Sequence, residues 1–105
     1  RNDGRARTTA RMMAAWRKAL RFAALPGAAR VQFRRQKLIE DGTPTVRYSL
    51  RSETQTGDVI GDERDYDLLK AAMVPLEQIA EHYDHDELMV ILDLETDSLT
   101  LPQND

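Results

Sequence analysis

The sequence lacks cysteine, long apolar runs and an apolar leader, and each absence excludes a class of protein. Without cysteine among its 105 residues, the chain has no disulfide scaffold, no thiolate zinc site and no cysteine nucleophile. No apolar run approaches the roughly 20 residues that span a membrane, so we expect no membrane segment. Residues 1–5 hold no apolar signal core, so we expect a cytoplasmic protein, with Met12 or Met13 as a candidate natural start.

Motifs that identify a reaction are also missing. The loop over residues 57–62 lacks the Lys-Ser/Thr ending of a phosphate-binding loop, and no serine stands in a G-x-S-x-G elbow. Residues 93–97 alternate as D-x-E-x-D, but Ser98 and Asn104 stand where an EF-hand needs glycine and glutamate, so we expect a turn. We therefore expect no cofactor and a protein that is not an enzyme.

The charges are divided between the two halves of the chain. Hydrophobic residues make up 41% and charged residues 31% of the sequence, which is typical of a globular domain. Residues 1–51 hold thirteen basic and three acidic residues, whereas residues 52–105 hold two basic and fifteen acidic ones. Either the halves fold against each other and neutralise one another, or one surface keeps its charge for a partner of opposite sign.

After residues 1–8, which we expect to be flexible, the chain has the periodicity of an amphipathic helix. The pattern runs from Thr9 to Leu25. It ends at Pro26-Gly27, because proline disfavours helical geometry in the residue before it and glycine opens a turn. Two adjoining stripes form the apolar face of this helix: Met12, Ala15, Ala19 and Phe22, and Met13, Trp16, Leu20 and Ala23.

Residues 29–51 alternate between apolar and polar side chains, which predicts an antiparallel hairpin. The turn falls at residues 41–44, D-G-T-P, because glycine accepts a positive φ and proline fixes φ. One face of the hairpin is apolar and the other is strongly basic. The apolar face holds Val31, Phe33, Val46, Tyr48 and Leu50.

The second half of the chain predicts a helix followed by two strands. Asp62 is the expected N-cap of a helix over residues 63–83, since acidic side chains favour the first turn of a helix. Pro75 lies inside this pattern and predicts a kink or a short break. Six apolar residues in seven over residues 88–94 indicate a well-covered strand, and residues 99–101 form a short last one.

Together these elements predict one α+β domain over residues 9–105, in the order α-β-β-α-β-β. We expect two layers: an antiparallel sheet of about four strands, with both helices on one face and the strand over residues 88–94 nearest the centre. Residues 52–63 have the composition of a loop. The expected core holds Trp16, Leu20, Phe33, Val46, Tyr48, Leu69, Met73, Leu76, Val90 and Leu92.

His82 and His85 are the only histidines, and they stand among acidic residues as H-x-x-H. Such a pair can share one helix face and, with a neighbouring carboxylate, hold zinc or iron. One alternative is therefore a small metal-dependent enzyme that uses these two residues. The other interpretation is two solvated imidazoles at a helix end, where a histidine favours the helix dipole.

Basic residues in the first half offer a second alternative, a nucleic-acid-binding protein. A pI of about 5.4 and the lack of a paired aromatic RNA-binding motif make nucleic acid the weaker candidate. The residues that could follow a phosphate backbone are Arg7, Arg11, Arg17, Lys18, Arg21, Arg30, Arg34, Arg35 and Lys37.

Acidic residues gather at both ends of the predicted second helix and favour a non-catalytic, protein-binding role. Such charges accelerate encounter with a basic protein, and aromatic anchors then hold the complex. We expect Tyr66 and Tyr83 to be the anchors wherever they are exposed; a homo-oligomer remains a further alternative. The two clusters are Asp58, Asp62, Glu63, Asp65 and Asp67, and Glu81, Asp84, Asp86 and Glu87.

The chain resembles the YezG-type immunity proteins of bacterial polymorphic toxin systems. The resemblance rests on the helix with Trp16 that ends at Leu25-Pro26, on the hairpin V-Q-F with V-R-Y, and on the acidic helix over residues 66–76. It covers roughly residues 9–101 and implies a bacterial protein without catalytic residues that binds and neutralises a cognate toxin. Small α+β secretion-chaperone-like domains share this order of elements and are the neighbouring possibility.

Overall fold

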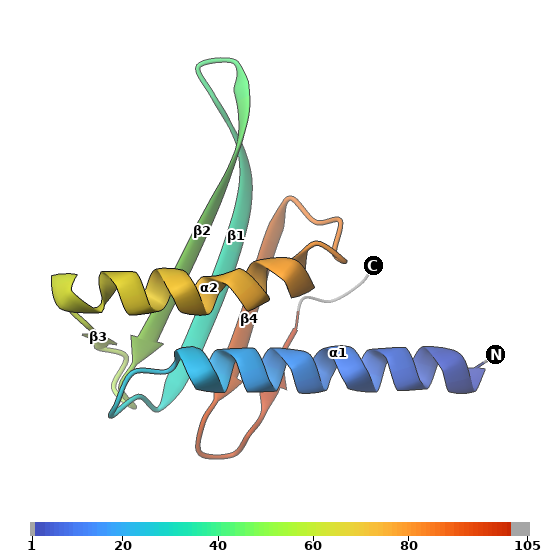
Figure 1. Cartoon of the computed structure of the whole chain (residues 1–105), viewed down its shortest axis with the longest axis horizontal. Helices are drawn as coiled ribbons and strands as arrows, with labels where there is room; N and C mark the ends of the chain where they lie inside the picture. Colours follow the sequence, from blue (N-terminus) through green and yellow to red (C-terminus); the bar gives the residue numbers. More distant parts are fainter. Residues whose placement is uncertain (1, 102–105) are drawn as a thin grey trace.

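The chain forms two layers, an antiparallel sheet of five strands and two helices that cover one of its faces (Figure 1). The structure, a computed structural model, describes the backbone of residues 2–101 and the side chains of residues 9–101. The sheet order is β3-β2-β1-β4-β5, so the predicted α+β class and antiparallel sheet are confirmed. The elements are α1 (Asn2–Ala23), β1 (Arg30–Glu40), β2 (Thr43–Glu53), β3 (Val59–Ile60), the 3₁₀ turn η1 (Glu63–Asp65), α2 (Tyr66–Ala80), β4 (Glu87–Asp93) and β5 (Leu99–Thr100).

The strand count and the sheet centre differ from the prediction. The segment expected to be a loop contributes β3, whose two residues pair with Ser52 and Glu53 and raise the count from four to five. The central strand is β1, with β2 and β4 on its two sides, and not β4. The apolar run of β4 instead reflects Met89 and Ile91, which stay half-buried on the face of the sheet that no helix covers.

Helix α1 begins earlier and buries a narrower stripe than the sequence predicts. Its helical backbone starts at Asn2 and not at Thr9; the side chains of residues 1–8 lie outside the described part. Trp16, Leu20 and Ala23 are buried, whereas Phe22 is 78% exposed. The second predicted stripe therefore faces the core, whereas the stripe that holds Phe22 faces α2, with Ala19 buried.

The hairpin of β1 and β2 is closed by two residues, and its end projects beyond the helices (Figure 1). Asp41 and Gly42 both have positive φ, 51° and 79°, as a two-residue hairpin loop requires, and Thr43 already belongs to β2. The pairing of β1 with β4 ends at Gln36, so residues 37–46 form a free arm.

Val46 and Tyr48 were predicted to be in the core, and the structure shows that this is wrong. They are 47% and 37% exposed, although they lie on the same sheet face as Phe33. Alternation identifies a face of a strand, but it does not show how far the covering helices reach. The apolar side chains of the arm and its base therefore stay in solvent.

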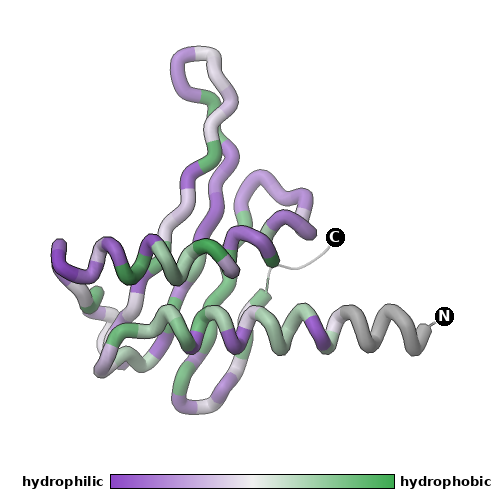
Figure 2. The backbone as a smooth tube through the Cα atoms, viewed as in Figure 1, coloured by the Kyte–Doolittle hydropathy of each residue, from purple (hydrophilic) through white to green (hydrophobic). Residues whose placement is uncertain are grey.

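The core forms where the two helices overlie β1 and β4. The start of α2 and the segment after its end lie outside this core, and Figure 2 shows that both are largely hydrophilic. Leu69 and Met73 are half-buried, at the side of the core. The fully buried large side chains include six predicted core residues and two others: Trp16, Leu20, Phe33, Leu76, Leu88, Val90, Leu92 and Val31.

Asp62 is an N-cap as predicted, but it caps the 3₁₀ turn η1, and α2 itself covers Tyr66–Ala80 and not residues 63–83. The Asp62 side chain accepts a hydrogen bond from Arg64 N–H at 2.8 Å, and Asp65 accepts one from the Asp62 N–H at 2.9 Å. This reciprocal pair is a capping box, which satisfies backbone donors that a helix start leaves free. The chain then passes through η1 into α2, which continues across Pro75 without a break.

Candidate partner-binding surface

Most ion pairs among the described residues join the basic half of the chain to the acidic half. Most of them lie at the surface, where a pair contributes at most about 1 kcal/mol to stability, but together they neutralise much of the charge. The first interpretation of the divided charge is therefore confirmed for these residues. The pairs are Arg17 and Arg21 with Asp97, Arg30 and Arg51 with Glu53, Arg34 with Glu87, and Lys37 with Asp84.

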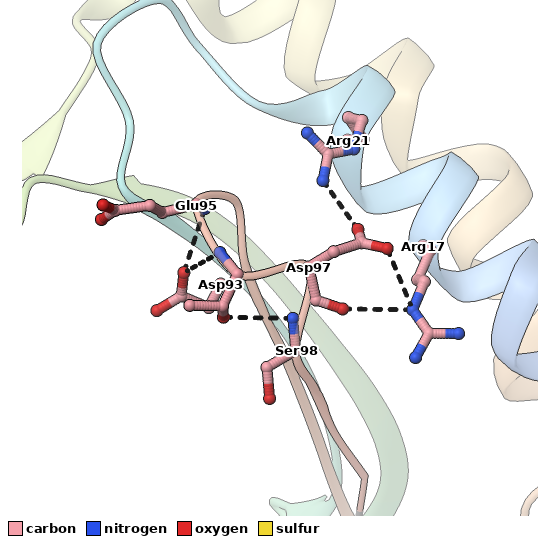
Figure 3. Close-up of polar contacts among 7 residues, drawn as sticks. Arg17, Arg21, Asp93, Glu95, Asp97 and Ser98 are labelled. Carbon is pink, nitrogen blue, oxygen red and sulfur yellow. Dashed lines mark hydrogen bonds and ion pairs between the residues drawn. The ribbon is translucent and has the colours of Figure 1, made fainter.

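The turn between β4 and β5 holds two arginines of α1 (Figure 3). Arg21 Nη2 lies 2.7 Å from Asp97 Oδ1, and Arg17 Nε donates to the Asp97 carbonyl oxygen at 3.3 Å. Asp93 Oδ1 accepts the N–H groups of Glu95 and Thr96, both at 3.0 Å. The D-x-E-x-D string is thus a turn, as predicted, and it engages two arginines of the nucleic-acid alternative.

The uncovered face of the sheet is balanced in charge and not strongly basic as predicted. Arg47 is paired with Glu40 along the arm, and Arg30 and Arg34 have the glutamate partners already named. Neighbouring strands place these acids beside the arginines, which the alternation within one hairpin does not reveal. Among the described residues, this face therefore offers no uncompensated row of cations to a phosphate backbone.

Arg35, one of the residues of the nucleic-acid alternative, is buried and closes the C-terminal end of α2. Its side chain lies on the helix-covered face of β1, and the residue is 4% exposed. Arg35 Nη1 donates to the Ala80 carbonyl oxygen at 2.6 Å, and Nη2 donates to that of Tyr83 at 2.8 Å. A cation is favourable there, because the last carbonyl groups of a helix carry the negative end of its dipole.

The acidic cluster after α2 is partly neutralised, and its tyrosine is not an exposed anchor. Asp84 lies 3.3 Å from Lys37, and Glu87 lies 2.6 Å from Arg34. Glu81 and Asp86 are exposed and have no ion pair among the described residues. Tyr83 is half-buried, and its hydroxyl oxygen accepts a hydrogen bond from the Trp16 indole N–H at 3.1 Å.

The acidic cluster at the start of α2 has carboxylates without basic partners among the described residues, and large apolar side chains are exposed beside them. We call it the acidic tip and define it as residues 58–68. Tyr66 is 64% exposed and Leu68 is 67% exposed. Glu63 and Asp67 are exposed and have no basic partner among the described residues, whereas Asp62 is paired with Arg64. Asp58 accepts a hydrogen bond from Thr56, and Asp65 is held in the capping box.

Within the acidic tip, hydrogen bonds lower the pKa of the Asp62 carboxyl group. The Arg64 guanidinium and then the Arg64 N–H stabilise the carboxylate and hold the pKa of Asp62 below its ordinary value of 3.8. The Asp62 side chain therefore stays ionised at every pH near neutrality. Its negative charge is paired with Arg64, and the N-terminal end of the helix dipole also favours it.

The two histidines do not form a metal centre with the described residues around them. His82 is exposed, and His85 is half-buried with its Nδ1 atom buried and without a hydrogen-bond partner. Both line a groove of about 400 Å³ together with Tyr83 and Asp84. Within residues 9–101, no group of three His, Asp or Glu side chains is placed to hold a metal ion.

A groove between α1 and α2 is a feature that the sequence did not indicate. It has a volume of about 560 Å³, and Met12, Ala15, Phe22, Pro75 and Ile79 are among its lining residues. The sequence predicts the apolar stripe of α1 that holds Met12 and Phe22, but it does not show that this stripe faces α2 and not the sheet.

Neither helix of the described chain is long and apolar enough to cross a membrane. Comparison with protein-family models, with curated proteins and with solved structures gave no match. A function is therefore inferred from the surfaces of the molecule itself. Among the predicted site residues, the structure leaves the acidic tip as the group that combines uncompensated charge with an exposed aromatic ring.

Proposed function

We propose that the protein is a non-catalytic binding module that uses its acidic tip to bind a basic protein. One observation carries the proposal: Tyr66 and Leu68 are mostly exposed beside Glu63 and Asp67, which have no basic partner among the described residues. Apolar anchors surrounded by a charged rim are the usual composition of a protein-binding site. The anchors hold the complex, and the rim accelerates encounter with a positively charged surface.

The resemblance to YezG-type immunity proteins suggests what this partner is. Under the proposal, the partner is a basic toxin, and binding neutralises it inside the bacterial cytoplasm. The acidic tip takes a cationic surface of that toxin, such as one that binds nucleic acid. The two arginines that Asp97 holds and the balanced charge of the open sheet face make nucleic acid the weaker candidate for this chain.

The proposal is tested by capture from a host lysate, followed by exchange of single side chains. The tagged protein is expected to retain a basic protein at a 1:1 ratio, and Tyr66→Ala is expected to weaken that complex at least tenfold. Asp67→Lys is expected to lower the association rate more than it changes dissociation, because an exposed charge acts mainly on encounter.

Phe22→Ala is the matched control, because Phe22 is an aromatic residue on the other helix that is even more exposed than Tyr66. The proposal predicts an unchanged complex for this variant. A captured protein that is acidic, captured nucleic acid, or equal losses for Tyr66→Ala and Phe22→Ala would each contradict the proposal.

A further inference from the structure

The outer edge of β2 is open along most of its length, and the direction of its backbone groups follows from the observed hydrogen bonds. Lys37 N–H donates to the Asp86 carbonyl oxygen at 2.8 Å, and Leu94 N–H donates to that of Ala29 at 2.9 Å. Odd-numbered residues of β1 therefore face β4, and even-numbered ones face β2, since bonding direction alternates along an antiparallel strand. By the register of the hairpin, the even-numbered residues of β2 point away from β1.

Three residues of this edge present free backbone groups. Strand β3 pairs with β2 only at Ser52 and Glu53, so no described strand lies beside Val46, Tyr48 and Leu50. Pro44 also points outward, and proline is tolerated at an edge position because its missing N–H is not needed for the sheet. An open edge of this kind is a template for a further strand.

We propose that this further strand is β2 of a second copy of the chain, paired antiparallel across a two-fold axis. A two-fold axis uses the same edge twice, so no additional partner surface is required. The arm suits such pairing because it extends past β4 and past the helices, which leaves space beside it (Figure 1). This proposal does not rest on the acidic tip or on the proposed function.

The position of β3 and the arginines of β2 restrict the register. Strand β3 occupies the edge from Ser52 onward, so the hairpin turn of the second copy must lie before that point. If Arg47 lay on the axis, two guanidinium groups would be directly opposed, which is unfavourable. Placing Val46 on the axis satisfies both conditions, because Arg47 then faces Thr45 of the second copy.

In this register the two copies exchange four main-chain hydrogen bonds. Each Val46 donates to and accepts from Val46 of the second copy, and each Tyr48 N–H donates to the Pro44 carbonyl oxygen opposite. Pro44 thus supplies the acceptor that is needed, and its lack of an N–H removes no bond within its own hairpin. Leu50 falls opposite the turn and gains no partner. An interface of this size predicts a weak dimer that forms with rising concentration.

The first test measures the mass of the protein by sedimentation from about 10 µM to about 1 mM, the range in which small interfaces associate. The wild-type protein is expected to pass from monomer to dimer, and Val46→Lys is expected to remain a monomer, because it opposes two ammonium groups on the axis. Ile39→Lys is the control: Ile39 lies on the same face of the arm but on the opposite strand, and it is 77% exposed.

If the Ile39→Lys variant forms the dimer and the Val46→Lys variant does not, the result supports pairing through the β2 edge. A wild-type monomer at the highest concentration overturns the proposal, as does equal loss of the dimer in both variants, which would assign it to the apolar face of the arm.

Amide hydrogen exchange tests the register. The Val46 and Tyr48 amides are expected to exchange at least tenfold more slowly in the dimer than in the monomer, whereas Leu50 is unchanged. A dimer in which Val46 and Tyr48 exchange as fast as in the monomer overturns the proposed pairing.

Discussion

Replacing Arg35 by methionine removes the cation that closes the C-terminal end of α2 while keeping a long, unbranched side chain. Two short hydrogen bonds, of 2.6 and 2.8 Å, are lost; the Ala80 carbonyl group keeps the backbone N–H of Tyr83 as a donor at 3.0 Å, whereas the Tyr83 carbonyl group loses its charged donor. The residue is 4% exposed, so little water reaches the site to replace these bonds. We therefore expect a loss of stability that a surface arginine would not produce.

The size of this loss follows from opposing contributions. Each hydrogen bond from a charged donor contributes about 1.5–3 kcal/mol, so the two together contribute roughly 3–6 kcal/mol. Methionine avoids the cost of burying a guanidinium, which offsets part of that sum, and the unpartnered Nε atom of Arg35 already adds to this cost. The net expectation is a decrease of about 2–4 kcal/mol, or roughly 8–16 °C in Tm for a domain of this size.

Urea unfolding followed by Trp16 fluorescence measures this change, because Trp16 is fully buried beside Tyr83. Arg34→Met is the matched control: Arg34 precedes Arg35 on the opposite face of β1, its side chain is 36% exposed, and its ion pair with Glu87 is expected to contribute less than about 1 kcal/mol. An Arg35→Met variant as stable as Arg34→Met would refute the capping role. A variant more stable than wild type would show that desolvation outweighs the two bonds.

Two further predictions concern the start of α2 and the β4–β5 turn. Gly61→Ala is expected to destabilise the fold by at least about 1 kcal/mol in thermal unfolding, because a φ of +122° is strained for any residue with a Cβ atom; unchanged stability would contradict this backbone strain. Hydrogen bonds lower the pKa of both Asp62 and Asp93 below 3.8, so their stabilisation is complete above that pH and is lost as pH falls through the folded-state pKa. Urea unfolding from pH 2 to 6 is expected to show this loss of stability. The double variant Asp62→Asn, Asp93→Asn is expected to lose less stability over the same range. An equal loss in the double variant would assign the acid sensitivity to other groups.

Local patterns in the sequence predicted much of the secondary structure. The D-G turn, the Asp62 cap and the apolar run of β4 are each encoded within a few residues. Tertiary arrangement decided the rest. Strand β3 is two residues long and has no periodicity of its own, so its pairing with β2 was not predictable.

The candidate site divides in the same way. The acidic tip is contiguous in the sequence and was predicted, whereas the burial of Tyr83 depends on Trp16, 67 positions away. Arg35 belongs to an alternating basic run, and only the position of α2 above β1 turns it into a buried cap. The exposed Phe22 likewise depends on how α1 is rotated against its neighbours, which one apolar stripe does not specify.

The association rate of the captured basic partner, measured for wild type and for Asp67→Lys at low and high salt, tests the binding role most directly. The acidic tip predicts a rate that falls steeply as salt rises, and a smaller, less salt-dependent rate for the variant, with little change in dissociation. A rate that is independent of salt, or one that is the same for both proteins, would contradict the binding role of the acidic tip.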